Sequence, residues 1–460
     1  MCFNWSIFLI RVYEILFGGI YGIFMEEKRA LVLTSVSPQF SSGMVLDYVS
    51  VLEMAGYSVD ILTKYQEKEI TNKIISAYDV FQPASERIIT LKKVFLKKVP
   101  FLYKLYKSLK CKSGEAFFPY IRIEDYDYPV PVDLYIDKLE RGKYNVVIVL
   151  YMQYMFSERS LYAIYQKLKV PMYAFTIDLY LMTGGCYYPG RCKGYLSGCK
   201  KCRYIHKKWR KQIEQHFQLK KDIYSSINLK IIANTWTEFL FKNSLATKDL
   251  HYFNASIAIN ENNFCLRDIA VARSFFRIPM TKSFVILAGV ANNTKRKGGK
   301  YLVKALNYFY DNLSESDKKN VLLMLIGRSE PSFRKQIKMD VLETGFLDKT
   351  RLSCAYSAAS IFISPSIDDA GPSMVNQSLM CGTPVVSFNI GTALDVIRDG
   401  LTGYAVGLKD FESMASAIYK LYKLSPVEYS QLRLNCRSQS LKLSSIPSIA
   451  NCFKQFLSEG

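Results

Sequence analysis

The chain has 460 residues, which is enough for two domains of ordinary size. Hydrophobic residues make up 49% of it and charged residues 22%, a balance that excludes a disordered chain. The net charge of +21 favours an anionic partner, such as a nucleic acid, an anionic lipid or a phosphorylated substrate. The sequence contains no zinc-finger, RNP or Walker A motif, so nucleic acid has no motif support.

The chain begins with an apolar stretch, residues 1–25, for which two explanations stay open. Residues 5–24 are apolar but are interrupted by Arg11 and Glu14. The stretch lacks a small-residue cleavage site, so we do not expect a signal peptide. Either Met25 is the true initiator, or the stretch is a helix that lies in the membrane interface.

Residues 26–258 are expected to form the first domain. Leu31–Thr34 and Val59–Leu62 are short apolar runs that predict buried strands, and Met44–Ala55 between them has helical periodicity. This order predicts the βαβ opening of a parallel sheet. Further strands are predicted over Val146–Leu150 and Met172–Thr176.

A strongly basic segment lies within the first domain. Arg87–Lys112 contains nine basic residues and no acidic one. Its apolar residues recur every three or four positions, and Pro100 divides it into two amphipathic pieces. Such pieces bind anionic bilayers, so the segment predicts docking on an anionic membrane surface. A solvated helix face over the core is the alternative.

A cysteine-rich segment follows the strand predicted over Met172–Thr176. It runs through Asp178, Thr183, Gly184 and Gly185 to four cysteines. The four are Cys186, Cys192, Cys199 and Cys202, with the spacing C-x5-C-x6-C-x2-C. Four thiolates at short spacing can hold Zn²⁺ tetrahedrally and fix a loop that has little core of its own. A reduced or disulfide-linked loop is the alternative, because only the last pair has the spacing typical of zinc sites.

A second alternation of strands and helices is predicted over residues 259–430, followed by a helical tail at 431–460. Its strands are expected over Phe284–Ala288, Val321–Ile326, Ile361–Ser364 and Val385–Phe388. Its helices are expected over Leu302–Tyr310, Ser353–Ala359 and Met374–Met380. The pattern predicts a second doubly wound α/β domain, and the tail can cross back to the first domain.

Residues 364–388 are the most informative part of the chain. They predict the end of a strand, a loop, a short helix that stops at Gly382, and a buried strand. Gly371 and Pro372 open the helix, and Ser373 lies near its cap position. The N–H groups and the positive dipole end of such a helix lie beside the carboxyl ends of parallel strands, and this geometry suits a diphosphate.

These residues resemble the donor-site signature of the retaining glycosyltransferases of family 4, a large family with the GT-B fold. In that signature an acid is followed, after seven residues, by a second acid. Asp369 matches the first, which the resemblance implies contacts the donor sugar. Gln377 takes the place of the second, implied to bind the ribose, and keeps hydrogen-bonding capacity without the charge. The resemblance implies two Rossmann-like domains facing a cleft, with the acceptor bound by residues 26–258 and the nucleotide sugar by residues 259–430.

Lys295–Gly298 resembles the family's loop for the donor diphosphate. In that loop an Arg is followed five residues later by Lys-Gly. Lys297 matches the Lys, and Asn292 stands at the Arg position. Arg296 can substitute, because a guanidinium can clamp phosphate bidentately. The alternative is a solvated basic loop. The resemblance also implies donor contacts from Gly43, Gly345, Phe346, Gly371, Ser373 and Met374.

The cysteine-rich segment resembles a subgroup of family 4 that builds bacterial surface polysaccharides. The subgroup shares a Thr-Gly-Gly-Cys sequence followed by spaced cysteines, with an Asp eight residues before the first Cys, as at Asp178 here. The resemblance implies that Asp178, Thr183, Gly184 and Gly185 lie on the acceptor side. Ile177 stands where the subgroup often has His. Retaining transfer does not require a base there if the leaving diphosphate assists the attack.

The sequence thus predicts a retaining glycosyltransferase of the hexosyltransferase class, which moves a sugar from a nucleotide sugar to a lipid-linked or saccharide acceptor. Asp369, Lys297 and Arg296 are the expected catalytic residues, and catalysis is expected to need no cofactor. We expect a role in surface polysaccharide biosynthesis, at the inner face of the cytoplasmic membrane. Two other classes stay open: a GT-B-like binding or partner subunit without transfer, motivated by Gln377 and Asn292, and a basic, zinc-stapled nucleic-acid binder.

Overall fold

The computed structural model describes most of the chain, with several gaps. The described residues are 27–37, 43–65, 73–76, 130–153, 155–289 and 295–459. Three features singled out in the sequence lie outside them, namely the apolar stretch 1–25, the basic segment Arg87–Lys112 and Asn292. Among the described residues, no helix combines the length and the apolar character needed to cross a bilayer.

The described residues of the first half form a seven-stranded parallel sheet. The strands are β1 (Arg29–Thr34), β2 (Ser58–Thr63), β3 (Lys73–Ser76), β4 (Val146–Tyr151), β5 (Met172–Phe175), β6 (Lys230–Ala233) and β7 (His251–Asn254). They pair in the order β3-β2-β1-β4-β5-β6-β7. β1 and β4 are mostly apolar and are buried almost throughout, as expected for a parallel sheet covered on both faces.

Helices cover both faces of this sheet. They are α2 (Met44–Met54), α5 (Glu158–Leu168), α6 (Arg210–Ser226) and α7 (Thr235–Lys242), with short 3₁₀ turns η1 (Val132–Leu134), η2 (Ile136–Lys138), η3 (Gly194–Ser197) and η4 (Lys207–Trp209). Alternate residues of β1 point to opposite faces, so Leu33 packs in the core with α5, α6 and α7, whereas Val32 packs with α2. Ser157 and Asn234 begin α5 and α7 with capping boxes.

The second half contains a six-stranded parallel sheet in its described residues. The strands are β8 (Phe284–Gly289), β9 (Val321–Ile326), β10 (Val341–Gly345), β11 (Ile361–Ser364), β12 (Val385–Phe388) and β13 (Gly403–Val406), in the order β10-β9-β8-β11-β12-β13. Its helices are α8 (Ile269–Phe275), η5 (Lys295–Lys297), α9 (Gly299–Asp311), α10 (Glu315–Lys318), α11 (Pro331–Arg334), α12 (Lys349–Ala358), α13 (Ser373–Met380), α14 (Ala393–Val396), α15 (Phe411–Tyr422), α16 (Pro426–Ser444) and α17 (Ile446–Ser458).

Both sheets are doubly wound, which confirms the predicted fold class. In each sheet the strand order reverses once, between β1 and β4 and between β8 and β11, and loops at such switch points form ligand sites. The start of α13 differs slightly from the expectation. Pro372 occupies its cap position without a side-chain hydrogen bond, and Ser373 is the first helical residue. Proline fits there because this position needs no N–H donor and tolerates its fixed φ angle.

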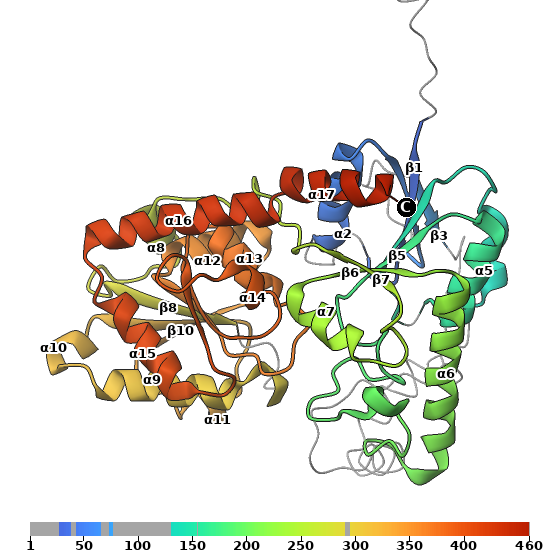
Figure 1. The fold of residues 1–460 in the computed structure, drawn as a ribbon. Helices are drawn as coiled ribbons and strands as arrows, with labels where there is room; N and C mark the ends of the chain where they lie inside the picture. Colours follow the sequence, from blue (N-terminus) through green and yellow to red (C-terminus); the bar gives the residue numbers. More distant parts are fainter. Residues whose placement is uncertain are drawn as a thin grey trace, which may run out of the picture.

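The C-terminal helix α17 belongs structurally to the first half. In Figure 1, α16 runs along the second half and α17 continues over the first half beside α2. Phe453 of α17 is fully buried, and its ring centroid lies 5.8 Å from that of Phe175 and 4.6 Å from that of Phe456. α17 therefore supplies part of the core on one face of the first sheet.

We predict that Phe453→Ala lowers the free energy of unfolding by about 3–5 kcal/mol, because it removes a buried aromatic ring and leaves a cavity. Urea unfolding of the full-length chain measures this cost. Lys454→Ala, at the exposed neighbouring position, is the matched control and should change stability by less than about 0.5 kcal/mol. Equal stability of the two variants would show that α17 contributes nothing to this core.

Candidate active site

The three predicted catalytic residues and the start of α13 lie at the switch point of the second sheet. η5 follows β8, and the segment of Asp368 and Asp369 follows β11, the strand next to β8. The start of α13 lies over the end of β8, since a Cβ placed on Gly289 would lie 2.9 Å from the Sδ of Met374. Two loops and one helix N-terminus therefore meet at this edge of the sheet, in the arrangement that binds phosphates in doubly wound folds.

Gly298 allows the two loops to approach each other. Its φ angle is 71°, in the left-handed region, and a Cβ at this position would lie 1.7 Å from the carbonyl oxygen of Pro365. No other residue fits so close to a backbone atom. The glycine thus brings Lys297, its neighbour, against the loop that carries Asp369.

An ion cluster forms the centre of the site. The Lys297 Nζ lies 2.6 Å from Asp369 Oδ2, and the Arg296 Nη1 lies 3.1 Å from the same oxygen. The Asp369 side chain is only 7% exposed, whereas Lys297 is 28% exposed. Burial alone would raise the pKa of Asp369, but the ammonium of Lys297 and the guanidinium of Arg296 hold it below its ordinary value. Asp369 is therefore an anion at neutral pH, and it fixes two cations at the mouth of the loop.

Gln377 has a partner that the sequence did not indicate. The hydroxyl of Tyr356, in α12, donates a hydrogen bond to Gln377 Oε1 at 3.1 Å, and both side chains are buried. This bond occupies the carbonyl side of the amide and orients its N–H₂ group as the available donor. A single tyrosine within a predicted helix carries no local signal of such a contact.

The remaining donor-side residues lie on several loops. Gly43, at the start of α2, has a φ angle of 82°, and a Cβ there would overlap the side chain of Lys349, so a loop of the first half touches the second half. Gly371 lies against Asn234 of the first half in a similar way. Gly345 ends β10 with a φ angle of 68°, and Phe346 after it is 79% exposed, with its ring accessible for stacking.

On the acceptor side, Asp178 reaches a small cavity at the carboxyl ends of β4 and β5. Its Oδ2 accepts a hydrogen bond from Gln153 Nε2 at 3.1 Å, and its Oδ1 accepts one from the N–H of Tyr180 at 2.8 Å. Phe175 and Tyr187 are among the residues that line this cavity. Polar oxygens within an apolar wall suit the recognition of a hydroxyl group.

Thr183, Gly184 and Gly185 do not share this cavity. Thr183 is 1% exposed, and its hydroxyl donates to the carbonyl oxygen of Cys186 at 2.6 Å. The N–H of Gly185 donates to Thr183 Oγ1 at 3.2 Å, and that of Gly184 donates to the Cys199 sulfur at the same distance. These three residues therefore hold the cysteine-rich segment together from within.

Two buried side chains of α6 bind backbone carbonyl oxygens of the same segment. The ammonium of Lys220, fully buried, donates to the carbonyl oxygens of Tyr180 at 2.6 Å and of Thr183 at 2.9 Å. A ring nitrogen of His216 lies 3.2 Å from the carbonyl oxygen of Gly184. Their roles depend on how α6 packs against the segment, which spacing within the sequence does not reveal.

The four cysteines line one small cavity of about 80 Å³. They are free thiols, and burial raises the pKa of Cys186, Cys199 and Cys202. As the side chains stand, no set of three or more His, Cys, Asp or Glu residues in the described part of the chain is arranged to hold a metal ion. The donor set suits zinc chemically, but binding would require the thiols to come together around the ion and lose their protons.

Several hydrogen bonds join the two halves around the site. The N–H of Gly190, in the cysteine-rich segment, donates to Asp368 Oδ2 at 2.8 Å. The Asn234 side chain donates to the carbonyl oxygen of Ala370 at 2.7 Å, next to Asp369. A cavity lined by Asn234 and Gly371 lies between the halves. The carboxyl edges of the two sheets thus face each other, which brings the acceptor side to the donor side.

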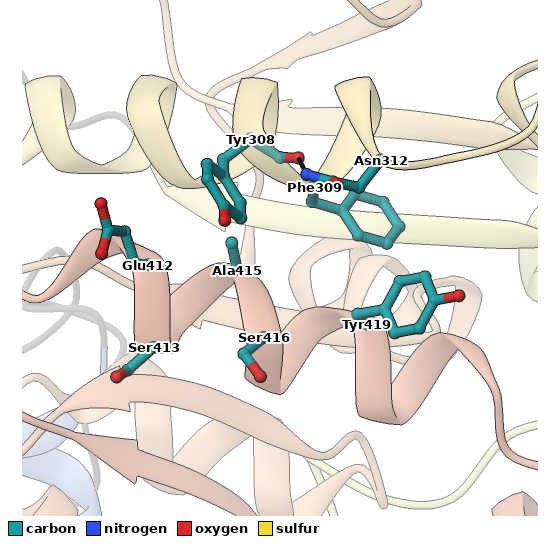
Figure 2. Close-up of a pocket in the computed structure, with 8 residues that line it drawn as sticks. All are labelled: Tyr308, Phe309, Asn312, Glu412, Ser413, Ala415, Ser416 and Tyr419. Atoms are coloured by element: carbon teal, nitrogen blue, oxygen red, sulfur yellow. Dashed lines mark hydrogen bonds between the residues drawn. The ribbon is translucent and has the colours of Figure 1, made fainter.

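A further groove, of about 530 Å³, lies away from this site. Figure 2 shows it between α9 and α15, with Tyr308 and Phe309 on one side and Tyr419 on the other. None of the predicted site residues lines it. Its walls are the bodies of two helices and not the ends of strands, so the groove is not part of the candidate active site.

Asp368 should make stability depend on pH. Burial raises its pKa to about 6, so the folded chain binds a proton more tightly than the unfolded chain between about pH 4 and 6, and stability falls as the pH rises through that window. We predict that Asp368→Asn is more stable than the wild type by about 1–2 kcal/mol near pH 7, with no gain below about pH 4.

Urea unfolding at several pH values measures this difference, with Asp137→Asn at an exposed position as the matched control. A gain for Asp368→Asn that is the same at every pH would contradict the assignment.

The zinc expectation stays a prediction. Metal analysis of freshly reduced protein should show at most one zinc per chain, and a chelator should then lower the melting temperature, because a bound structural metal stabilises the folded state. Replacing Cys199 and Cys202 together with Ser should abolish both effects. Metal-free protein whose stability does not respond to chelator would refute the site.

Residues 282–423 match the model of the family described as "Glycosyl transferases group 1". A comparison with curated protein sequences found no significant match.

Three solved structures illustrate the similarity in fold. Sucrose-phosphate synthase from Thermosynechococcus elongatus has a TM-score of 0.60 at 17% identity, over 94% of this chain and 99% of that one. HepE from Anabaena, solved with UDP, has a TM-score of 0.60 at 11% identity, over 94% and 100%. WaaG, a glycosyltransferase involved in lipopolysaccharide biosynthesis, has a TM-score of 0.54 at 14% identity, over 94% and 100%. The chain thus has the GT-B fold, and residues 282–423 match a glycosyltransferase domain.

Proposed function

We propose that the protein transfers a sugar from a nucleotide-sugar donor to a saccharide or lipid-linked acceptor, with retention of the anomeric configuration. The observation that carries this proposal is the ion cluster of Asp369, Lys297 and Arg296 beside the N-terminus of α13. Two cations and a helix N-terminus at a sheet switch point form a site for a diphosphate. The carboxylate beside them suits the hydroxyls of a sugar attached to that diphosphate.

In this mechanism the donor diphosphate leaves toward Lys297 and Arg296. The bond between the anomeric carbon and the phosphate oxygen breaks, and its electron pair stays on the diphosphate, where the two cations and the N–H groups of α13 stabilise the charge. The acceptor oxygen bonds to the same face of the anomeric carbon, and its proton passes to the departing phosphate oxygen. No side-chain base is then required, which agrees with Ile177 at the position where a His is common in the subgroup.

The acceptor is proposed to enter from the first half. Asp178 and Gln153 offer polar atoms at the carboxyl ends of β4 and β5, and the contacts between Asn234 and Ala370 bring that edge to Asp369. The Thr-Gly-Gly-Cys sequence and the similarity to WaaG support an acceptor in bacterial surface polysaccharide biosynthesis. HepE, solved with UDP, supports a nucleoside diphosphate as the carrier of the donor sugar.

Lys297→Ala tests the donor site. We predict that it lowers transfer from a nucleotide sugar by tenfold or more, since a charge-assisted contact to phosphate is worth about 1.5–3 kcal/mol. The assay is transfer with the nucleotide sugar that most raises the melting temperature in a donor screen. Lys300→Ala, an exposed lysine on the next turn, is the matched control and should leave transfer unchanged.

Other outcomes would favour the remaining classes. Near-normal transfer by Lys297→Ala would show that Lys297 does not bind the donor diphosphate. Tight nucleotide-sugar binding by the wild type, without transfer or hydrolysis, would favour a binding or partner subunit. Binding to nucleic acid that persists at high salt would favour a nucleic-acid-binding protein.

Docking on an anionic membrane is a further part of the proposal, and it rests on the basic segment Arg87–Lys112. Replacing Lys92, Lys93, Lys97 and Lys98 with Gln should release the protein from vesicles that contain anionic lipid, since each cation near such a surface contributes about 1 kcal/mol. Cosedimentation with chains starting at Met1 and at Met25 separates this effect from that of the apolar stretch. Salt-insensitive binding of the substituted Met25 chain would rule electrostatic docking out.

A further inference from the structure

The cysteine-rich segment of the first half reaches the donor residues of the second half directly. We call residues 186–202 the cysteine loop. The N–H of its Gly190 donates to Asp368 Oδ2 at 2.8 Å, and the ring centroid of its Tyr188 lies 3.8 Å from the guanidinium carbon of Arg296. The cysteine loop and one of the two donor-side cations are therefore in contact, although the first pair is separated by 178 residues.

The guanidinium of Arg296 is held from two directions. Its Nη1 donates to the carbonyl oxygen of Asp368 and to Oδ2 of Asp369, both at 3.1 Å. The ring of Tyr188 lies against it. The Arg296 side chain is only 18% exposed, so the cation–π contact is largely desolvated and stronger than a surface contact. A guanidinium with one end fixed by oxygens and one side against a ring has little freedom to turn.

Tyr188 is well suited to this contact. It is half-buried and belongs to the first half, yet it lies within electrostatic range of Asp369 on the donor side and of Asp178 on the acceptor side. Burial, and then the carboxylate of Asp369, raise the pKa of its phenol above the ordinary value. The ring therefore stays neutral at physiological pH, as a cation–π partner between charged groups.

We propose that Tyr188 is a positioning residue for sugar transfer, which orients the Arg296 guanidinium toward the leaving diphosphate. With the ring against one side, N–H groups at the edge of the guanidinium stay available for bidentate contact with phosphate. This inference rests on the proposed donor site. It gives the cysteine loop a role, because the residues just before the loop are held by Lys220 and His216, and the loop then carries Tyr188 to the donor half.

The test uses the full-length protein and inorganic pyrophosphate, a probe that carries the diphosphate without a base or a sugar. Calorimetry measures its binding to the wild type, Tyr188→Leu, Tyr188→Phe, Arg296→Ala and the double variant Tyr188→Leu/Arg296→Ala. Tyr188→Leu is expected to weaken binding about tenfold, whereas Tyr188→Phe keeps the ring and should bind within about twofold of the wild type. In the Arg296→Ala background, Tyr188→Leu should have no further effect.

Tyr165→Leu is the matched control, because the ring of Tyr165 also lies beneath a cation, the ammonium of Lys169, at 5.2 Å. Tyr165 belongs to α5 and is far from the donor loops. It should leave pyrophosphate binding unchanged. Equal binding by the wild type and Tyr188→Leu would overturn the inference, and so would an equal loss with and without Arg296, which marks a general structural effect. A wild type that binds neither pyrophosphate nor any nucleotide sugar would instead refute the donor site itself, and this inference with it.

Discussion

The contact between a buried carboxylate, Asp369, and two cations from the neighbouring loop is the interaction on which the site depends. A buried charge is costly unless it is paired, and the salt bridges from Lys297 and Arg296 at 2.6 and 3.1 Å provide that pairing. The pairing requires the loops after β8 and β11 to touch. They touch because these strands are neighbours at the switch point and because Gly298 lets one backbone approach the other.

The same constraint explains why the second half does not act alone. The donor loops receive contacts from the first half at Gly190, Tyr188 and Asn234. The first two lie in the segment after β5, and Asn234 directly follows β6. α17 then packs its aromatic side chains on the core of the first half. A chain whose last helix completes the first core has its two halves tied together, which keeps the acceptor side opposite the donor side.

Local rules account for much of this structure. Val321–Ile326, Ile361–Ser364 and Val385–Phe388 are mostly apolar runs, and each is a strand over the predicted residues. The position of Asp369 just ahead of a helix also followed from the sequence. The contacts of Tyr356, Lys220 and Tyr188 did not, because they depend on which helix or loop packs beside another, and a lone Tyr or Lys carries no periodic or spacing signal. The cap of α13 differed by one residue for a related reason, since Pro372 and Ser373 can both open a helix.

An experimental structure of the protein with its nucleotide-sugar donor bound tests the role of this ion cluster. We predict that the diphosphate lies between Lys297, Arg296 and the first turn of α13, that Asp369 contacts sugar hydroxyls, and that the ring of Tyr188 remains against Arg296. A donor whose diphosphate lies away from these residues, with the cluster of Asp369, Lys297 and Arg296 unchanged, would contradict this prediction.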